Sequence, residues 1–465
     1  MIADKRLAAY NRTLTRPNEV VLHILKFVSN FNEALLTAEI TQTFFKFLGI
    51  NIWSSNAIWA IPPIIFIFIS PIYRRVLMNK KYDTFLYNMV SLSSLFFANS
   101  IAFMVLFNLE NFSANQSIPN FFTIALGIVS FTFIDNAKMI HENLVYDYMT
   151  EYTMEFKRKR FEYYGLIIEK IGRIFGSFIS CLYVVFYRTN FARFSDYFYT
   201  NMQFTYYFAI CLNVFAVLCI FLLWPKHFVL QMTPVEHNPT SLFDYFFPGA
   251  NYIVNLEASN QRLIRRLFFS VGIYWFVAVN LTQWVSQKFM IDYPGIVSNS
   301  PMQAIDVGTA WGSISLTIFY TLWGLTDIIT QPIKKKLYKH SKLISRLLNF
   351  FGFAVYAFCY YIYDKNIRLF IIFLGLNGLC YDWLLYRKII KKLRKDKSLA
   401  HLTKKQQKFL VDKIVNIVTF LAEITFFLVI PAILDPVSDK LNVLGISILQ
   451  LILCVTIPRD TQFSL

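Results

Sequence analysis

The sequence has few charged residues for its length. Only 16% of its 465 residues are Asp, Glu, Lys or Arg, whereas a soluble domain averages about 25%. A chain of this size with so little charge cannot cover a water-soluble globule with polar surface. The shortage argues against a soluble enzyme, a disordered chain and a secreted disulfide-rich module, and it leaves a polytopic membrane protein.

Glycine and cysteine are also scarce, and two catalytic motifs are missing. There are 15 Gly and 6 Cys, and every Cys falls in an apolar segment, where a thiol is typically a buried small side chain. The sequence has no Gly-x-x-x-x-Gly-Lys-Ser/Thr phosphate loop and no His-Glu-x-x-His pair, which argues against ATP-driven transport and against a zinc enzyme. We therefore expect no cofactor and no metal site.

Long apolar segments dominate instead. Hydrophobic residues make up 56% of the chain and aromatic residues 18%. A helix needs about 20 apolar residues to cross the hydrocarbon core of a bilayer. Twelve segments qualify, at roughly 21–46, 54–72, 84–107, 119–141, 163–186, 204–224, 266–288, 305–329, 346–363, 367–386, 409–433 and 441–457. The predicted fold class is an all-α membrane protein with twelve transmembrane helices in two six-helix halves.

Three of these segments have unusual features. The first is the weakest, because polar residues at Asn30, Asn32, Glu33 and Glu39 interrupt it. The fourth is expected to continue as a helix through Tyr148. Only three residues separate the ninth segment from the tenth.

Basic residues lie in alternate connections. The chain has 45 Lys+Arg against 28 Asp+Glu, a net charge of +17, and 32 of the 45 fall in the N-terminal tail and in every second connection. The positive-inside rule then places both termini in the cytoplasm and explains the charge without nucleic acid. Two N-glycosylation sequons, at Asn111 and Asn115, fall in a connection on the opposite side. Contact of the basic segment 387–408 with anionic lipid is the less favoured reading of that segment.

The segments divide into two sets of six around a hydrophilic connector. The predicted organisation is a tail at 1–20, a six-helix half at 21–224, a cytoplasmic linker at 225–265, a second half at 266–457 and a tail at 458–465. This layout resembles the major facilitator superfamily of secondary transporters. The superfamily's signature between the second and third spans is degenerate here, because Arg74, Arg75, Lys80 and Lys81 are present without its two glycines and Asp.

An internal repeat is visible in the fifth and eleventh segments. Glu169-Lys-Ile-Gly-Arg-Ile174 and Asp412-Lys-Ile-Val-Asn-Ile417 both read acid, Lys, Ile, any residue, polar, Ile. Parallel repeats of this kind are expected in the superfamily.

A narrower resemblance covers about thirty residues. Tyr146-Asp147, the basic run 157–160, Gly165 and the stretch 171–177 with its two glycines look like the folate–biopterin transporter branch. The sugar–cation symporter branch resembles the same region. The resemblance implies a small polar solute, with an organic anion such as a pterin and a sugar both left open.

Carboxylates inside the apolar segments are candidates for cation coupling. An ionisable side chain in a span is costly and is a functional candidate for that reason. At 1.5 Å of rise per residue, Glu33 lies about 18 Å into the first span and Glu423 about 21 Å into the eleventh. Asp135 lies in the fourth. We expect Glu33, Asp135 and Glu423 to bind a coupling proton or sodium ion, the alternative being carboxylates that are hydrogen-bonded to a neighbouring helix.

Other polar residues in the spans are candidates for a solute cavity and a cytoplasmic gate. Asp135, Lys138 and Glu142 share one helix face by their spacing, and Glu169 and Arg173 share another. These charges suit a gate, an anion site, or internal pairing without function. Trp284 could stack on a solute or anchor the span at the interface. The predicted cavity residues are Asn30, Lys138, Lys170, Arg173, Asn280, Gln283, Asn377 and Tyr381, and the predicted gate residues are Glu142, Glu169, Asp382, Asp412 and Lys413.

The function predicted from the sequence is secondary active transport of a small polar organic solute by alternating access, coupled to H⁺ or Na⁺. We expect a monomer in the plasma membrane or an organelle membrane, with the solute and the lipid bilayer as partners and no nucleic acid. The chain is not expected to be an enzyme. The alternatives are a non-transporting receptor or scaffold on a carrier fold and, less favoured, a membrane-embedded transferase.

Overall fold

The protein is helical throughout the part of the chain that the structure describes. The computed structural model describes residues 16–48, 56–77, 85–109, 121–152, 155–188, 201–223, 245–247, 250–292, 301–380, 389–400, 402, 404–434 and 439–455. Within these ranges it has twelve helices of seven or more residues and no strand.

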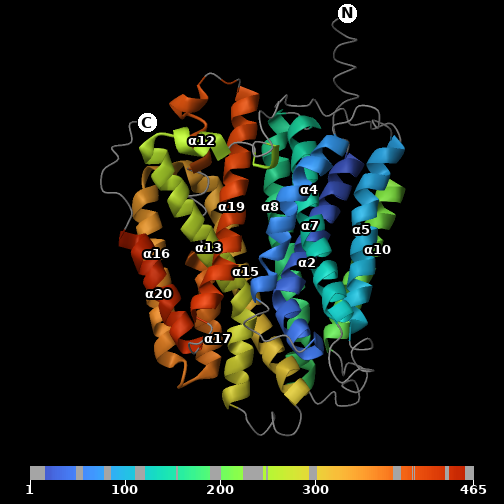
Figure 1. Cartoon of the computed structure of the whole chain (residues 1–465), viewed down its shortest axis with the longest axis vertical. Coiled ribbons are helices and arrows are strands. Elements are labelled where there is room, and N and C mark those ends of the chain that lie inside the picture. Colours follow the sequence, from blue (N-terminus) through green and yellow to red (C-terminus); the bar gives the residue numbers. More distant parts are fainter. Residues whose placement is uncertain are drawn as a thin grey trace, which may run out of the picture. The chain divides into compact units, whose positions relative to one another are not determined.

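Figure 1 labels the helices along the chain. The twelve are α2 (Arg16–Leu48), α4 (Ile61–Leu77), α5 (Phe85–Phe107), α7 (Phe121–Tyr152), α8 (Glu155–Arg188), α10 (Asn201–Leu223), α13 (Ala258–Asp292), α15 (Pro301–Lys339), α16 (Ser341–Ile362), α17 (Ile367–Leu376), α19 (Lys404–Leu434) and α20 (Asp439–Val455). Shorter elements are α12 (Ala250–Asn255), η2 (Asn377–Cys380) and η3 (Lys397–Leu399). Each of the twelve overlaps one predicted segment, so the predicted fold class is confirmed.

Several details of the spans match the sequence. Among the described residues, five stretches are long and apolar enough to cross a membrane: Phe121–Glu142, Phe204–Leu223, Ala258–Phe289, Val307–Thr330 and Leu343–Ile362. The fourth helix, α7, does continue past Tyr148. The short break between α16 and α17 is closed by Asn366, whose Oδ1 accepts hydrogen bonds from the amides of Arg368 and Leu369 at 3.0 and 3.1 Å and so caps α17.

The chain forms two compact units. Unit 1 contains residues 1–234 and 294–313, and unit 2 contains residues 235–293 and 314–465. The predicted boundaries of two six-helix halves and a linker stay a prediction.

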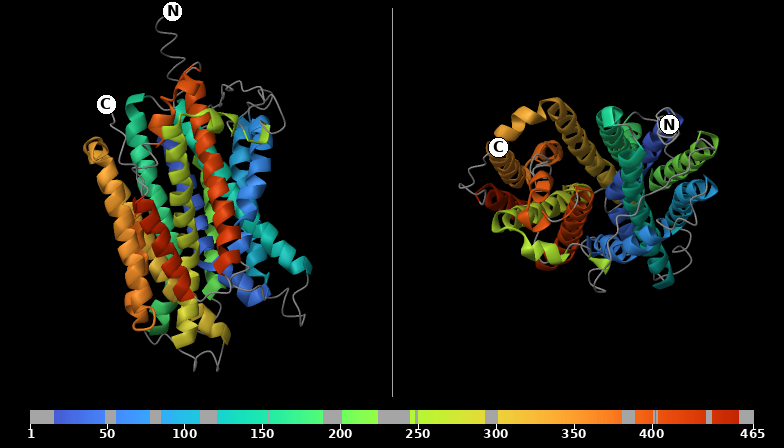
Figure 2. Two further views of the ribbon diagram at one scale, coloured as in Figure 1. Left: turned by 60° about the vertical axis from the view of Figure 1, so that its left-hand side comes forward. Right: turned by 90° about the horizontal axis from the view of Figure 1, so that it is seen from above.

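In unit 1, α2 packs against α8, α7 and α10, and the view from above in Figure 2 shows the blue-to-green helices next to one another. Glycines on α8 allow its close approach to α2. A Cβ at Gly172 would lie 2.6 Å from the Phe27 carbonyl oxygen, and a Cβ at Gly176 would overlap the carbonyl oxygen of Phe31. Small residues four apart are a common device for close helix contact in membranes.

Unit 2 repeats the helix pairing of unit 1. The first and fifth helices of unit 1, α2 and α8, pair as α13 and α19 do in unit 2, and α5 and α10 pair as α16 and α20 do. The contacts of α7 with α2 and α5 correspond to those of α17 with α13 and α16. This correspondence supports the internal repeat seen in the fifth and eleventh segments, which are α8 and α19.

Five cysteines whose side chains the structure describes are free thiols. Cys181, Cys219, Cys359 and Cys380 are buried, as predicted, but Cys211 is exposed. Cys211 lies on α10, a helix that presents large apolar side chains such as Tyr207 and Phe215 on its exposed face.

Candidate functional site

The first helix of unit 1 is buried and polar along most of its length. Between residues 21 and 44 of α2 most side chains are buried, including Asn30, Glu33, Glu39 and Gln42. Buried polar groups cost free energy unless they are hydrogen-bonded. The polar residues that weaken the first segment in sequence are therefore the ones whose partners matter.

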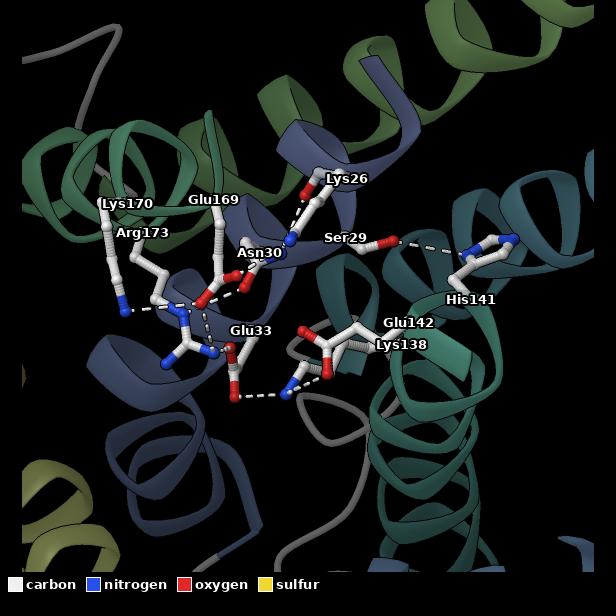
Figure 3. Close-up of polar contacts among 10 residues, drawn as sticks. All are labelled: Lys26, Ser29, Asn30, Glu33, Lys138, His141, Glu142, Glu169, Lys170 and Arg173. Atoms are coloured by element: carbon white, nitrogen blue, oxygen red, sulfur yellow. Dashed lines mark hydrogen bonds and ion pairs between the residues drawn. The ribbon is translucent and has the colours of Figure 1, made fainter. Parts of the chain in front are cut away.

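Glu33 lies between two cations from other helices (Figure 3). Its Oε1 is 2.6 Å from Lys138 Nζ on α7, and its Oε2 is 3.0 Å from Arg173 Nη2 on α8. The three side chains are at most 9% exposed. The sequence named all three residues, and the structure brings them together.

The network extends from Arg173 along α2 and α8. Arg173 Nε donates to Asn30 Oδ1 at 2.9 Å, and Asn30 Nδ2 donates to the backbone oxygen of Lys26 at 2.9 Å. The Lys26 ammonium lies 3.0 Å from Glu169 Oε2, and Lys170 Nζ lies 3.4 Å from Glu169 Oε1. We call the residues Lys26, Asn30, Glu33, Lys138, Glu142, Glu169, Lys170 and Arg173 the charge network.

Two further acids lie on α7. Glu142 Oε2 is 3.6 Å from Lys138 Nζ one turn away, as the spacing predicted. Asp135 is 8% exposed and, among the described residues, has no hydrogen bond or ion pair. With Asp135, the network holds four cations and four carboxylates, so its formal charge is balanced.

His141 lies beside the network but is not one of its charges. Its Nδ1 is 3.3 Å from Ser29 Oγ, and its ring stacks on Phe96 with the centroids 3.9 Å apart. Ser29 and His141 are both buried, so this contact joins α2 to α7 inside unit 1.

In unit 2, α13 carries a group of unsatisfied buried polar atoms. Gln283 is fully buried, and neither its Nε2 nor its Oε1 has a hydrogen-bond partner among the described residues. The hydroxyls of Thr282 and Ser286 are likewise buried without a partner there. Asn280 Nδ2 donates to the Phe276 carbonyl one turn back at 2.8 Å. Trp284 is fully buried.

The remaining candidates are dispersed in unit 2. Asn377 is buried in η2, and its Nδ2 donates to the Leu374 carbonyl at 2.9 Å. Asp412 lies 3.5 Å from Arg394. Lys413 and Glu423 lie on α19, and Glu423 is buried. Tyr381 and Asp382 lie outside the described residues, as do the sequons at Asn111 and Asn115.

The sequence-based candidates did not include Lys26, which belongs to the charge network, or Glu39, which lies outside it. Lys26 lies one turn before Asn30 and could have been found by helical spacing. Glu39 accepts hydrogen bonds from two neighbouring helices, and only three-dimensional contact reveals its donors, Ser180 and Thr205. Among the described residues no group of three or more His, Cys, Asp or Glu is arranged to hold a metal ion.

Similarity to known proteins appears in structure and not in sequence. No protein-family model matches the chain, and no curated protein matches it. The nucleoside transporter NupG is similar in structure, with 15% identity, 95% of this chain and 98% of that chain covered, and a TM-score of 0.61. The xylose transporter XylE from E. coli, in a partially occluded inward-open conformation, has 10% identity, coverage of 97% and 99%, and a TM-score of 0.58.

These matches over whole chains define the fold. The chain has the fold of the major facilitator superfamily, and it is a multi-pass integral membrane protein. Identities of 15% or less show the fold and assign no branch of the superfamily.

Proposed function

We propose that the protein is a secondary active transporter that moves a small polar organic solute across a membrane by alternating access, with H⁺ or Na⁺ as coupling ion. The observation that carries the proposal is the unsatisfied amide of Gln283 in a helix of this fold. A buried amide without partners costs about 1–3 kcal/mol. A polar solute that reaches α13 offsets this cost by supplying the missing hydrogen bonds.

The chemistry of α13 favours a neutral solute with several hydroxyl groups. Between residues 282 and 286, the unsatisfied atoms are the amide nitrogen and oxygen of Gln283, the hydroxyls of Thr282 and Ser286 and the indole nitrogen of Trp284, which offer both donors and acceptors and no charge. Sugars and nucleosides present such groups. Two structural neighbours are a nucleoside transporter and a xylose transporter, which agrees with this class of solute.

An organic anion is the weaker candidate on the same grounds. An anion site needs a cation that is not already neutralised. Lys138, Lys170 and Arg173 each lie within 4.0 Å of a carboxylate in the charge network, and when Asp135 is counted with the network, its cations and carboxylates are equal in number. The charge network therefore supports a gate or a fixed helix junction more than an anion site.

The coupling ion is proposed to bind at intramembrane carboxylates. Protonating Glu33 would leave Lys138 and Arg173 buried beside a neutral group, which is costly. This cost makes Glu33 less suitable than Asp135, whose carboxylate has neither a hydrogen bond nor an ion pair among the described residues. Glu423 is the third candidate, on α19 of unit 2.

The positive-inside rule supports a proposal for the topology of the protein. We place both termini in the cytoplasm and the charge network, with Glu142 and Glu169, near the inner side of the membrane, where Asp382, Asp412 and Lys413 would serve as further gate residues. The protein is proposed to act as a monomer in the plasma membrane or an organelle membrane. Structural neighbours that are transporters and not enzymes support a non-enzymatic function.

Uptake into proteoliposomes tests the proposal. Purified protein is reconstituted, and entry of labelled uridine, xylose and folate is measured with a pH gradient, with a sodium gradient and with neither. We expect gradient-driven uptake of uridine or xylose and a raised KM in Gln283→Leu. The control is Asn349→Leu, because the amide of buried Asn349 is satisfied by the Ser345 carbonyl at 2.7 Å.

Two outcomes contradict the proposal. Uptake of folate alone would reverse the assignment of a neutral solute. The absence of uptake of all three solutes by well-folded protein would favour a receptor or scaffold on a carrier fold.

A further inference from the structure

We propose that Glu39 is a proton-binding site, separate from the charge network, built by hydroxyl groups of α8 and α10 around one carboxylate of α2. Glu39 is 1% exposed. Its Oε1 accepts a hydrogen bond from Ser180 Oγ at 2.5 Å, and its Oε2 accepts one from Thr205 Oγ1 at 2.5 Å. Both oxygens of the carboxylate are therefore held by hydroxyls from two other helices.

The site is distinct in position from Glu33. Six residues of α-helix separate the two carboxylates, about 9 Å along the axis of α2. Glu33 faces α7 and α8 through Lys138 and Arg173, whereas Glu39 faces α8 and α10 through Ser180 and Thr205. The two carboxylates thus occupy different faces and different depths of one helix.

The donors decide which of the two carboxylates accepts a proton without loss of hydrogen bonds. Lysine and arginine side chains only donate hydrogen bonds. The O–H group of a protonated Glu33 would therefore face the donors of Lys138 and Arg173 and find no acceptor there. A serine or threonine hydroxyl can donate or accept. When Glu39 is ionised, both hydroxyls donate to it. When Glu39 is protonated, its O–H donates to one hydroxyl oxygen, and that hydroxyl rotates to donate to the carbonyl one turn back on its own helix.

This chain already uses such backbone acceptors. Ser177 Oγ donates to the Arg173 carbonyl at 3.1 Å, and Thr37 Oγ1 donates to the Glu33 carbonyl at 2.8 Å. The alternative orientation proposed for Ser180 is therefore one that Ser177 adopts on the same helix, α8, and the one proposed for Thr205 is the orientation that Thr37 adopts on α2. The site remains satisfied in both protonation states without movement of a helix.

One titratable side chain from a packed helix adjoins the site. Tyr206 of α10 is buried, and its hydroxyl lies 2.7 Å from Thr43 Oγ1. The Thr43 hydroxyl donates its hydrogen to the backbone carbonyl oxygen of Glu39 at 2.9 Å. In the hydrogen bond between Thr43 and Tyr206, the Tyr206 hydroxyl is therefore the donor. On α8, the titratable residues next to Ser180 in sequence are Cys181 and Tyr183. On α7, Lys138 pairs with Glu33.

Binding of a proton at Glu39 changes contacts among three helices. In the ionised state two short hydrogen bonds join α2 to α8 and α10, and short O–H···O⁻ bonds are stronger than neutral ones. Protonation neutralises the acceptor and weakens both junctions. As a coupling device this step rests on the proposed transport function, but proton binding itself does not.

Infrared difference spectroscopy of the purified full-length protein tests proton binding without a substrate. Spectra recorded in acidic and alkaline buffer are subtracted, and the C=O stretch of protonated carboxyl groups is followed. We expect one component of this band to vanish in Glu39→Gln and to persist in Glu33→Gln. Ser180→Ala and Thr205→Val should each shift the frequency of that component, because they change its hydrogen bonds.

A second variant of Glu39 and a sodium control complete the experiment. Glu39→Asp serves if Glu39→Gln does not fold, and it should move the component to another frequency. A band unchanged in the Glu39 variants overturns the proposal, as does a spectral change driven by Na⁺ and not by pH that is lost in Glu39→Gln. If the band behaves as expected but wild-type proteoliposomes take up neither uridine nor xylose, the proton site stands and the transport function fails.

Discussion

Lys138 Nζ lies 2.6 Å from Glu33 Oε1, although 105 residues separate the two positions in the chain. Both side chains are nearly inaccessible, and Arg173 lies on the other carboxylate oxygen. The pair fastens α7 to α2 within unit 1, and its strength depends on both charges being present.

Removing one member of this pair should be more harmful than removing both. Lys138→Met leaves Glu33 with one cation and should lower the free energy of unfolding by about 3–5 kcal/mol. The reason is that removal of one partner of a buried ion pair leaves the other charge buried without full compensation. The double variant with Glu33→Gln should recover part of the loss. Thermal unfolding in detergent measures both variants.

The exposed pair of Arg394 and Asp412 is the matched control. These side chains are 39% and 33% exposed and 3.5 Å apart. Arg394→Met should change stability by less than about 1 kcal/mol, since exposed ion pairs contribute little. Equal losses in Lys138→Met and Arg394→Met would contradict the importance assigned to the buried pair.

The junction of α8 with α2 should not tolerate side chains at its glycines. Gly176→Ala introduces a methyl group where the Phe31 carbonyl lies, so the helices must separate, at a cost of about 1–3 kcal/mol. Gly445→Ala is the control, because a Cβ there meets nothing within 4 Å; a helical Gly replaced by Ala should be neutral or stabilising by about 0.5–1 kcal/mol. Equal melting temperatures for the two variants would show that the close approach is not needed.

Asp396 should make unit 2 sensitive to acid. It accepts hydrogen bonds from Asn260 Nδ2 at 2.6 Å, the Glu257 amide at 3.2 Å and the Ser398 amide at 2.9 Å, which tie the segment before η3 to the start of α13. Burial raises the pKa of the Asp396 carboxyl, but the hydrogen bonds it accepts, first that from Asn260, outweigh burial and lower the pKa below its ordinary value.

The sign of the pH effect follows from that shift. Because the folded pKa lies below the unfolded one, the contribution of Asp396 is present above about pH 4 and is lost as the pH falls through the folded pKa. Asp396→Ala should therefore be less stable than the wild type near neutral pH, with the difference shrinking in acid. Melting temperatures of Asp396→Ala and the wild type in a series of buffers provide the measurement. A difference between the two that does not change with pH would contradict the lowered pKa of Asp396.

Gln283 should show opposed effects on stability and activity. Gln283→Leu removes a buried amide that has no partner among the described residues, so the folded protein should be at least as stable as the wild type. Uptake should weaken, because the solute loses its hydrogen bonds to that amide. A variant with unchanged uptake would remove Gln283 from the solute site, and melting temperature with initial uptake rate gives both values.

The charge network shows what could be predicted of the site and what could not. Intramembrane charge identified Glu33, Lys138 and Arg173 as candidates, because ionisable groups are costly there. Sequence could not assign their partners, since each contact joins different helices. The anion site and the coupling role predicted for these residues stay predictions, and the structure adds that Lys138 and Arg173 each pair with Glu33 on another helix.

The sequence by itself determined the number of long helices in the described part of the chain and their approximate positions, since each of the twelve apolar segments overlaps one of twelve helices. Hydrophobic length is a local property, and a helix satisfies its backbone hydrogen bonds within one segment. Only the tertiary structure decided which buried polar groups have partners. It placed Glu33 between cations and Glu39 between hydroxyls, and the sequence could not distinguish these acids because their partners lie more than a hundred residues away.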